Sequence, residues 1–318
     1  MMSTQTTHPT IDLPSFQSCE EDLKEHFVNE FTTGGFSFPR DADAWELAAL
    51  FVAMKQRSIS PRSRLVHWSP ELKLKLTSPE WARFVHALTT IEAESIAGMD
   101  LKPRMSQDVE DVELHDDLFN EWRIQHLHLA DRRPNPNEFV ERAAELLFVM
   151  VEEDDIYFID LLKHEFSDPA LLELVHRNWP QLIDDSRSDH ICIPHEMRPS
   201  PAEHGRRRRA GFTKPVAMSD GTVYLCPGGG IVLSERKRKK HGRGKGGHLN
   251  LEAIRNANDI HRIAYSIHKW CNENAPTLVS DIQRQTGEAL TSLRTLRLRL
   301  DNDGPFFEEL ITGFQVRP

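Results

Sequence analysis

The chain has 318 residues, 39% of them hydrophobic and 28% charged, with a net charge of -10 and a mean hydropathy of -0.51, which is typical of a globular protein of two or three domains. Its longest apolar run, Trp45–Met54, falls far short of the roughly 20 residues that a membrane-spanning helix needs, so we expect no membrane contact. Its four cysteines lie far apart without a CxxC spacing, which argues against a disulfide framework or a cysteine zinc site and favours the cytoplasm.

The N-terminal third begins with a polar stretch and continues at helical spacing. Residues 1–14 have no basic start and no apolar segment, so we expect a disordered tail and no signal peptide. Residues 15–100 form the predicted helical region. Its clearest helix begins at Pro79 after a Ser78 cap and ends before Gly98, the order of residues that helix termini favour.

The apolar pattern changes from helical to alternating near residue 123. The stretch RIQHLHL (123–129) alternates, which predicts a strand. Two apolar, β-branched and aromatic runs on either side of EEDD (152–155) then predict a β-hairpin buried on both faces. A helix capped by Ser167 or Asp168 follows, so residues 101–185 form a predicted α+β domain.

Several polar side chains in this predicted sheet indicate a candidate site. In a strand, His126 and His128 point to the same side, roughly 7 Å apart at a rise of ~3.3 Å per residue. Asp160 interrupts an apolar strand, and His164 follows on the same face by the same alternation. We therefore expect one cluster on one sheet surface, formed by His126, His128, Arg142, Tyr157, Asp160 and His164.

Three interpretations of these histidines remain open. In the first, they are core or edge residues whose nitrogens bond to backbone groups. In the second, they form a metal-free acid–base pair, since imidazole titrates near neutral pH, and an arginine stabilises the charge that develops when RNA is cleaved by its own 2′-hydroxyl. In the third, they bind a metal, because His-x-His on a strand is a common ligand spacing that Asp160 and His164 could complete.

The segment LHDDLFNEWRIQHLHL (114–129), with the hairpin and helix after it, resembles a family of uncharacterised bacterial and phage-associated proteins. That family carries D-x-L-x-x-D-W-G-I-x-H-L-H-L before a strand hairpin and H-x-x-W at its end. The resemblance covers about a quarter of the chain and departs at Glu121, where the family has aspartate, and at Arg123, where it has glycine. It implies no established activity. The layout is more loosely similar to RelE-type ribonuclease toxins, which implies metal-independent RNA cleavage on a sheet.

A basic segment follows residues 186–211, which are polar, rich in proline and arginine, and interpreted as a linker. From Arg206 to Lys245 there are 12 Lys and Arg residues against Asp220 and Glu235, a net charge of +10 that leaves -20 for the rest. This segment is either a binding element for the phosphates of RNA or DNA, a nuclear localisation signal or a solvated loop. The acidic N-terminal half suggests a protein partner. The predicted nucleic-acid contacts are Arg206, Arg207, Arg208, Arg209, Arg236, Lys237, Arg238, Lys239 and Lys240.

Residues 212–318 form the last predicted domain. A strand pair turns at SDG, and the CPGGG loop (226–230) lacks the spacing of a phosphate-binding loop, so it is interpreted as a flexible turn. A helix over 278–287 and a second over 289–300 precede a short β pair, which together resemble a winged helix-turn-helix. In that fold the second helix enters the DNA major groove, so Arg294 and Arg297 are further predicted contacts. The alternative is an ordinary helical hairpin.

These patterns predict an α+β protein with a helical N-terminal region, a small central sheet domain with a hairpin, and a helical C-terminal region resembling a winged helix. The leading hypothesis is a toxin-like or phage-defence-like endoribonuclease that acts on RNA without metal or cofactor. One alternative is a non-enzymatic DNA-binding or adaptor protein, and another is a metal-dependent hydrolase at His126 and His128. Whether the chain is an enzyme stays open. The expected domains are 1–14, 15–100, 101–185, the linker 186–211 and 212–318.

Overall fold

The chain divides into two compact units, which are described separately. Unit 1 comprises Met1–Val52 and Ile254–Pro318, and unit 2 comprises Ala53–Ala253. The predicted boundaries after residues 100, 185 and 211 all lie inside unit 2. The computed structural model describes residues 12–114, 116–131, 138–141, 144–163, 169–210, 212–233, 248–290 and 292–317, without the side chains of Arg209, residues 231–233 and His248.

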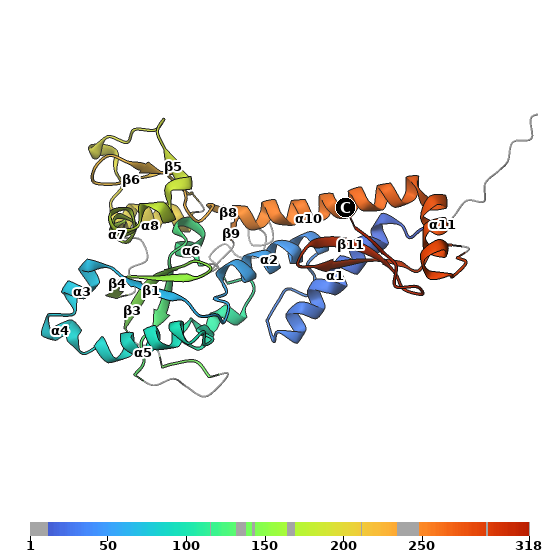
Figure 1. Ribbon diagram of the computed structural model, residues 1–318. Coiled ribbons are helices and arrows are strands. Elements are labelled where there is room, and N and C mark those ends of the chain that lie inside the picture. Colours follow the sequence, from blue (N-terminus) through green and yellow to red (C-terminus); the bar gives the residue numbers. More distant parts are fainter. Residues whose placement is uncertain are drawn as a thin grey trace, which may run out of the picture. The chain divides into compact units, whose positions relative to one another are not determined.

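The predicted α+β class is confirmed, with helices in the N- and C-terminal parts of the chain and a central sheet domain (Figure 1). The central sheet of unit 2 has the strand order β1-β4-β3-β2. The predicted hairpin is present, and β3 and β4 pair antiparallel with a register shift between Phe148 and Val149. A strand that the sequence analysis did not predict, β1, adds to β4 in parallel. The four strands are β1 (Leu65–Trp68), β2 (Gln125–His128), β3 (Glu145–Val151) and β4 (Asp155–Lys163).

Both faces of this sheet are buried, as the apolar runs predict, because each face packs against helices (Figure 1). One face carries Leu147 and Phe158, against Leu72 of α3 and Leu88 of α5. The other face carries Phe148 and packs against α6, α7 and the pair of strands β6 (Val216–Ala217) and β7 (Val223–Tyr224). The helix expected from Pro79 is divided in two. The helices are α3 (Pro70–Lys75), α4 (Pro79–Ala82), α5 (Val85–Ile96), α6 (Asp117–Trp122) and α7 (Ala170–Asn178).

The remainder of unit 2 consists of short elements and one further helix. The segment interpreted as a linker contains helix α8. This helix begins with a reciprocal capping box between Ser200 and Glu203. The short strands form a sheet of order β5-β7-β6 and a separate β8–β9 pair. These elements are η1 (Lys102–Arg104), η2 (Gln107–Glu110), η3 (Pro180–Leu182), η4 (Asp184–Ser186), β5 (Arg187–Ser188), η5 (His195–Met197), α8 (Pro201–Arg209), β6 (Val216–Ala217), β7 (Val223–Tyr224), β8 (Ile231–Leu233) and β9 (His248–Asn250).

Unit 1 combines helices with a three-stranded antiparallel sheet of order β10-β11-β12. The first predicted C-terminal helix is present as the end of α11, which Gly287 closes in the left-handed conformation at φ +80°. Two helices, α2 and α10, cross the division between the units. The elements are α1 (Phe16–Thr33), α2 (Ala44–Arg57), α10 (Leu251–Glu273), α11 (Ala275–Thr286), β10 (Leu296–Asp301), β11 (Gly304–Glu309) and β12 (Gln315–Val316).

The predicted recognition helix over 289–300 is wrong, because its second half forms strand β10. Leu296 and Leu298 are buried while Arg297 and Arg299 point outward, so burial follows the period of a strand. A tight turn ending at Gly304, with φ +113°, then returns the chain into β11. The winged helix-turn-helix interpretation therefore loses the element that would enter the DNA groove.

Two further observations concern membrane-spanning helices and the cysteines. Throughout the ranges that the structure describes, no helix is both long and apolar enough to cross a membrane. All four cysteines lie within those ranges and carry free thiols. Burial raises the pKa of the Cys19, Cys226 and Cys271 thiols to about 12 in each case.

Candidate functional site

The predicted histidine pair lies on β2, the edge strand of the central sheet. The two imidazole rings meet edge to face, with centroids 5.9 Å apart, as expected for side chains on one side of a strand. The His126 side chain keeps 17% of its surface exposed, whereas His128 as a residue keeps 3%. Asp116, which caps α6, places Oδ2 4.0 Å from Nδ1 of His126. The pair thus has an inner ring, an outer ring and a nearby carboxylate.

Of the other predicted members of this cluster, the structure describes Tyr157 and Asp160, which do not contact this histidine pair. Strand β3 separates β2 from β4, and two strand spacings are about 10 Å. On β4, Asp160 forms an ion pair with Lys75 at 2.6 Å. Tyr157 stacks on His67 with ring centroids 4.6 Å apart. Arg142 and His164 lie outside the described residues.

A second histidine–carboxylate pair lies at the opposite edge of the sheet. His67 on β1 is 2.6 Å from Asp155 on β4 through Nε2, and each side chain is about one-third exposed. Trp179 contacts the neighbouring Tyr157 ring edge to face. The sequence analysis missed this pair because it depends on a parallel pairing between strands 88 residues apart, which no local pattern indicates.

Glu121 lies at the centre of a buried polar network. Its side chain is 1% exposed, and its Oε2 accepts hydrogen bonds from Arg208 at 2.5 Å and from His204 at 3.0 Å. The Arg208 guanidinium also lies over the Trp122 ring, 4.6 Å from its centroid. Arg208 is therefore buried, and its predicted contact with nucleic acid is corrected. The reason is helical geometry: His204 and Arg208 are one turn apart on the inward face of α8.

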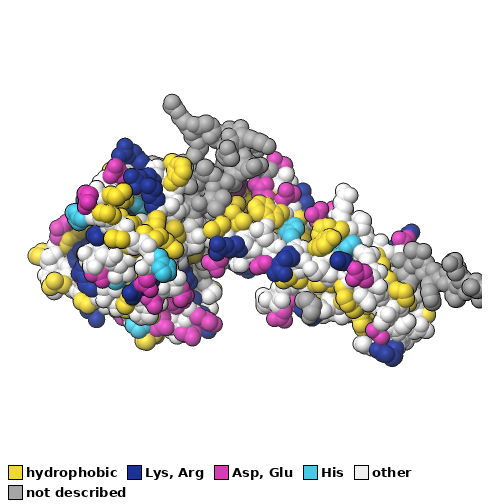
Figure 2. Space-filling view, turned by 90° about the horizontal axis from the view of Figure 1, so that it is seen from above, with side chains coloured by type: hydrophobic (Ala, Val, Ile, Leu, Met, Phe, Trp, Pro, Cys, Tyr) yellow, Lys and Arg dark blue, Asp and Glu magenta, His cyan; other side chains and the backbone are white. Residues whose placement is uncertain are grey.

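The remaining predicted nucleic-acid contacts differ in their surroundings. Arg206 is 70% exposed, and Arg207 is partly exposed. Arg294 forms an ion pair with Asp12, and Arg297 lies 3.8 Å from Asp22. Figure 2 shows Lys and Arg side chains interspersed with Asp and Glu on the face that it draws. The Arg209 side chain and Arg236, Lys237, Arg238, Lys239 and Lys240 lie outside what the structure describes.

The CPGGG loop packs against the carboxyl end of α6. Gly228 donates its N–H to the Glu121 carbonyl at 2.9 Å, and Gly230 donates to the Asn120 carbonyl at 3.0 Å. A Cβ atom on Gly228 would lie 2.2 Å from the Phe119 carbonyl oxygen, so only glycine allows this approach. The interpretation as a flexible turn missed this role, which is to satisfy the last carbonyls of a helix.

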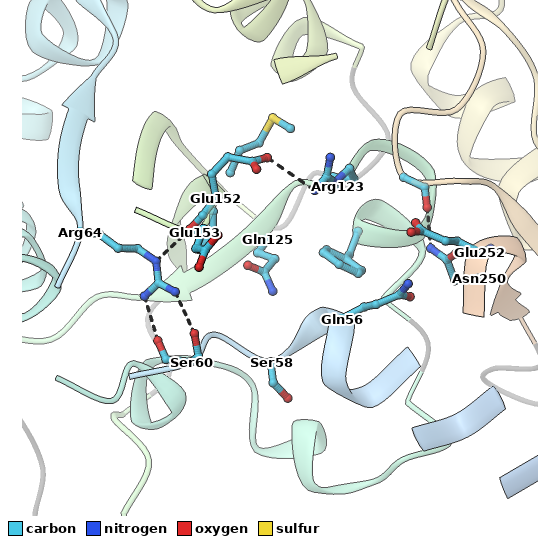
Figure 3. A pocket seen from close by; sticks show the side chains of 14 residues that line it. Gln56, Ser58, Ser60, Arg64, Arg123, Gln125, Glu152, Glu153, Asn250 and Glu252 are labelled. Carbon is cyan, nitrogen blue, oxygen red and sulfur yellow. Dashed lines mark hydrogen bonds and ion pairs between the residues drawn. The ribbon is translucent and has the colours of Figure 1, made fainter. Parts of the chain in front are cut away.

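A cavity of about 300 Å³ lies in unit 2, where α6, the ends of β2 and β3, and the CPGGG loop meet (Figure 3). Arg123 lies at its wall in the left-handed conformation, at φ +59°, and ends α6. A glycine would adopt this conformation without strain. The cavity is lined by Gln56, Ser58, Ser60, Arg64, Phe119, Arg123, Gln125, Met150, Val151, Glu152, Glu153, Gly228, Asn250 and Glu252.

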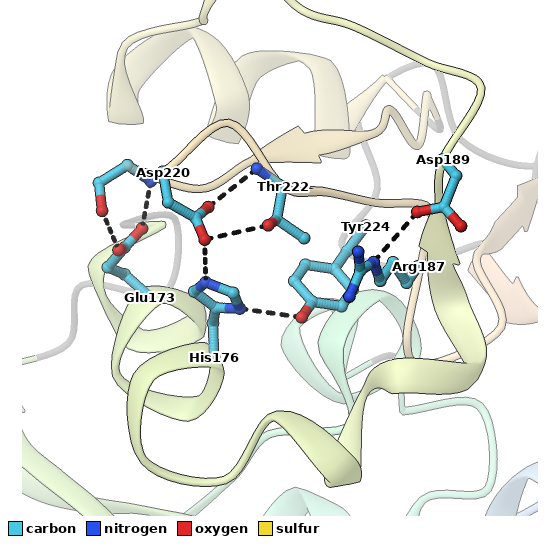
Figure 4. Close-up of polar contacts among 8 residues, drawn as sticks. Glu173, His176, Arg187, Asp189, Asp220, Thr222 and Tyr224 are labelled. Atoms are coloured by element: carbon cyan, nitrogen blue, oxygen red, sulfur yellow. Dashed lines mark hydrogen bonds and ion pairs between the residues drawn. The ribbon is translucent and has the colours of Figure 1, made fainter.

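A chain of hydrogen bonds ties α7 to the β6–β7 strand pair (Figure 4). Nδ1 of His176 lies 2.9 Å from the Tyr224 hydroxyl, and Nε2 lies 3.1 Å from Asp220. Burial raises the pKa of Tyr224, which is 1% exposed. The Tyr224 hydroxyl is therefore out of reach of solvent. We interpret this network as a structural link between α7 and the strands.

No three His, Cys, Asp or Glu side chains within the described ranges come together in a metal-binding arrangement. The chain matches no protein-family model, no curated protein and no solved structure. The geometry of unit 2 is therefore the basis for a functional proposal.

Proposed function

We propose that this chain acts on nucleic acid and that unit 2 is a metal-independent endoribonuclease with His126 and His128 as its acid–base pair. The observation that carries the proposal is the edge-to-face contact of the two imidazoles at 5.9 Å on an edge strand. Two adjacent imidazoles supply one proton acceptor and one proton donor near neutral pH. The free thiols of all four cysteines also support a cytoplasmic location.

The chemistry assigns the two rings opposite tasks. One neutral imidazole accepts the proton of the ribose 2′-hydroxyl as its oxygen attacks the phosphorus atom. The protonated imidazole gives its proton to the departing 5′-oxygen as the P–O bond breaks, which leaves a 2′,3′-cyclic phosphate. His126, the more exposed ring, contacts the substrate, and the Asp116 carboxylate lies 4.0 Å from its Nδ1 atom. Arg142 is the candidate for stabilising the negative charge on the oxygens of the phosphorane.

The test is cleavage of a single-stranded RNA in the presence of EDTA, with the products analysed for 2′,3′-cyclic phosphate ends. His126→Ala should lower the cleavage rate by about 10²–10⁴-fold, the usual contribution of an acid or base. The matched control is His190→Ala, which removes an exposed imidazole of unit 2 and should leave the rate unchanged. The melting temperature of both variants should stay within a few degrees of the parent.

Two outcomes would overturn the proposal. Equal cleavage by the parent and by His126→Ala would assign the activity elsewhere. Cleavage that EDTA abolishes and a divalent metal restores would favour the metal-dependent hydrolase instead.

Nucleic-acid binding is a separable part of the proposal, because it depends on the basic segment. Several phosphates neutralised at once should give binding that weakens steeply with salt, with a log–log slope of several units. Deleting residues 236–245 should flatten that slope. Binding whose affinity does not change with salt concentration would contradict the proposal that the basic segment binds nucleic acid.

A further inference from the structure

The cavity of about 300 Å³ in unit 2 has walls of mixed polarity, and Figure 3 shows the side chains that line it with the hydrogen bonds and ion pairs between them. Gln56 lies in the last turn of α2, Phe119 lies in α6, and Glu252 lies in the first turn of α10. The volume suits a small molecule or a single extended side chain.

Arg64 and Gln125 use their side-chain donors within the protein, whereas the Arg123 guanidinium forms a 3.5 Å ion pair with Glu152. Arg64 donates from Nε to the Glu152 carbonyl at 3.1 Å and from Nη1 to the Ser60 carbonyl at 2.8 Å. Its Nη2 donates to the Ser60 hydroxyl at 3.1 Å. Gln125 donates from Nε2 to the Arg57 carbonyl at 2.6 Å. A ligand that needs hydrogen bonds from these groups would have to break existing ones.

Acceptors, in contrast, are left over. The Oε1 atom of Gln56 is buried without a hydrogen-bond partner. Within the described ranges, no hydrogen bond or ion pair engages the Glu252 carboxylate. Glu152 has only a loose ion pair with Arg123, at 3.5 Å. A buried amide oxygen without a donor is unfavourable, so a ligand that brings N–H groups and draws this amide toward it gains from satisfying it.

The charge of the wall favours the same kind of ligand. Glu152, Glu153 and Glu252 outnumber Arg64 and Arg123 in the lining. Glu153 is paired with Arg62 outside the lining at 2.6 Å, so the carboxylates that a cation could approach are those of Glu152 and Glu252. The aromatic ring of Phe119 adds a surface that attracts a cation over its face. The cavity lining includes none of the arginines and lysines of the nucleic-acid surface proposed above, so the two sites are distinct.

We propose that this cavity binds the guanidinium or ammonium head of an organic cation. The head places its N–H groups against Gln56 and the Glu252 carboxylate and its positive charge near the Phe119 ring. Both a free amine and an arginine or lysine side chain of a protein partner present this chemistry. The proposal does not depend on the ribonuclease proposal, since it uses neither histidine.

Isothermal titration calorimetry on the full chain tests this inference with three probes. Agmatine represents a free guanidine, N-acetyl-Gly-Arg-Gly-amide represents a protein side chain, and AMP represents an anion with an aromatic ring. We expect agmatine or the peptide to bind and AMP to give no heat. Tighter binding of agmatine would identify a free amine as the ligand, and tighter binding of the peptide a protein side chain.

Two variants and one control locate the binding. Glu252→Gln removes one exposed carboxylate and should raise the Kd about fivefold, the effect of one solvent-screened charge contact. Phe119→Leu should raise it further. Glu196→Gln, an exposed carboxylate of unit 2 outside the cavity, should leave the Kd unchanged. The inference is overturned if neither cation binds, if AMP binds instead, or if Glu252→Gln leaves the Kd of the cation unchanged.

Discussion

Unit 2 buries several of its arginines, whereas every described arginine of unit 1 keeps part of its side chain exposed. In unit 2, Arg104 donates to both carboxylate oxygens of Glu94, at 2.6 and 3.0 Å, and both side chains are at most 5% exposed. Arg208 is buried in the same way against Glu121. In unit 1, Arg294 pairs with Asp12 at the surface and is 73% exposed. Arginine therefore takes part in the core of unit 2 as well as its surface, and lies at the surface in the described part of unit 1.

Unit 1 does bury one carboxylate, but it uses no arginine to hold it. Glu309, which is fully buried, accepts hydrogen bonds from the hydroxyl groups of Thr295 and Thr312 and from two backbone N–H groups. A buried charge requires either a counter-ion or several hydrogen bonds, and the two units show the two solutions. A run of basic residues in a sequence therefore does not indicate which of its arginines are exposed.

The largest expected effect comes from breaking a buried ion pair of unit 2. Arg208→Ala leaves the Glu121 carboxylate buried without its counter-ion, which should lower the free energy of unfolding by about 3–5 kcal/mol. Urea denaturation measures this loss. Arg206→Ala removes an arginine of the same helix that is 70% exposed, and should change stability by no more than about 0.5 kcal/mol.

A double variant separates a lost charge pair from lost packing. Glu121→Leu combined with Arg208→Met removes both charges, so it should be less destabilised than Arg208→Ala alone. If the double variant is less stable than Arg208→Ala, the attraction between Glu121 and Arg208 itself stabilises unit 2. The loss in Arg208→Ala would then not be due only to an unpaired buried charge.

The next effect concerns the apolar side of β10 in unit 1. Leu298 is 1% exposed, so Leu298→Ala should lower the free energy of unfolding by about 2–5 kcal/mol. Leu300 is only partly buried, and Leu300→Ala should cost clearly less. A helix over this segment would bury positions 293, 296 and 300 instead. A larger loss at Leu300 than at Leu298 would therefore restore the helical interpretation.

The strands of the central sheet and strand β10 show which elements local sequence can predict. RIQHLHL and the EEDD hairpin were predicted correctly because alternation and a polar turn are local signals. LRLRL (296–300) carries the same alternation, but it was interpreted as a helix because Arg294 and Arg297 have helical spacing and a helix precedes them. The capping box at Ser200 and Glu203 was a readable signal for α8 that was missed.

The candidate site was predictable only in part, for a physical reason. Alternation placed His126 and His128 on one face, and their rings are in contact. Whether Asp160 joined them depended on strand order, and the intervening β3 and the Lys75 ion pair keep it away. Non-local pairings of this kind, including Glu121 with Arg208, leave no periodic trace in the sequence.

A smaller effect, dependent on pH, tests the buried carboxylate of unit 1. Burial alone would raise the pKa of Glu309, but hydrogen bonds from Thr295, Thr312 and Ile311 outweigh it and lower that pKa below its ordinary 4.5. The unfolded chain then binds the proton more readily, so the stabilisation is complete above pH 4.5 and is lost as the pH falls through the folded value. Glu309→Gln should cost about 1.5–3 kcal/mol at pH 7, the contribution of hydrogen bonds to a charged group.

Denaturation curves of the parent and Glu309→Gln between pH 7 and pH 3 measure this difference. The gap in the free energy of unfolding should narrow below pH 4.5. A gap that stays constant with pH would show that the amide disturbs packing, and that ionisation of Glu309 contributes nothing.

The smallest expected effect is that of a surface arginine in unit 1. The Arg294 and Asp12 side chains are 73% and 53% exposed, so Arg294→Ala should lower stability by about 0.2–1 kcal/mol, and less in high salt. As a base-contacting residue of a recognition helix, Arg294 would instead contribute about 1–3 kcal/mol to duplex DNA binding. Because the segment after it forms β10 and the guanidinium is held by Asp12, we expect DNA affinity of the variant to equal that of the parent. Fluorescence anisotropy with a labelled duplex at low salt decides between these outcomes. A tenfold loss of affinity in the variant would show that Arg294 contacts nucleic acid and is not only a surface ion-pair partner of Asp12.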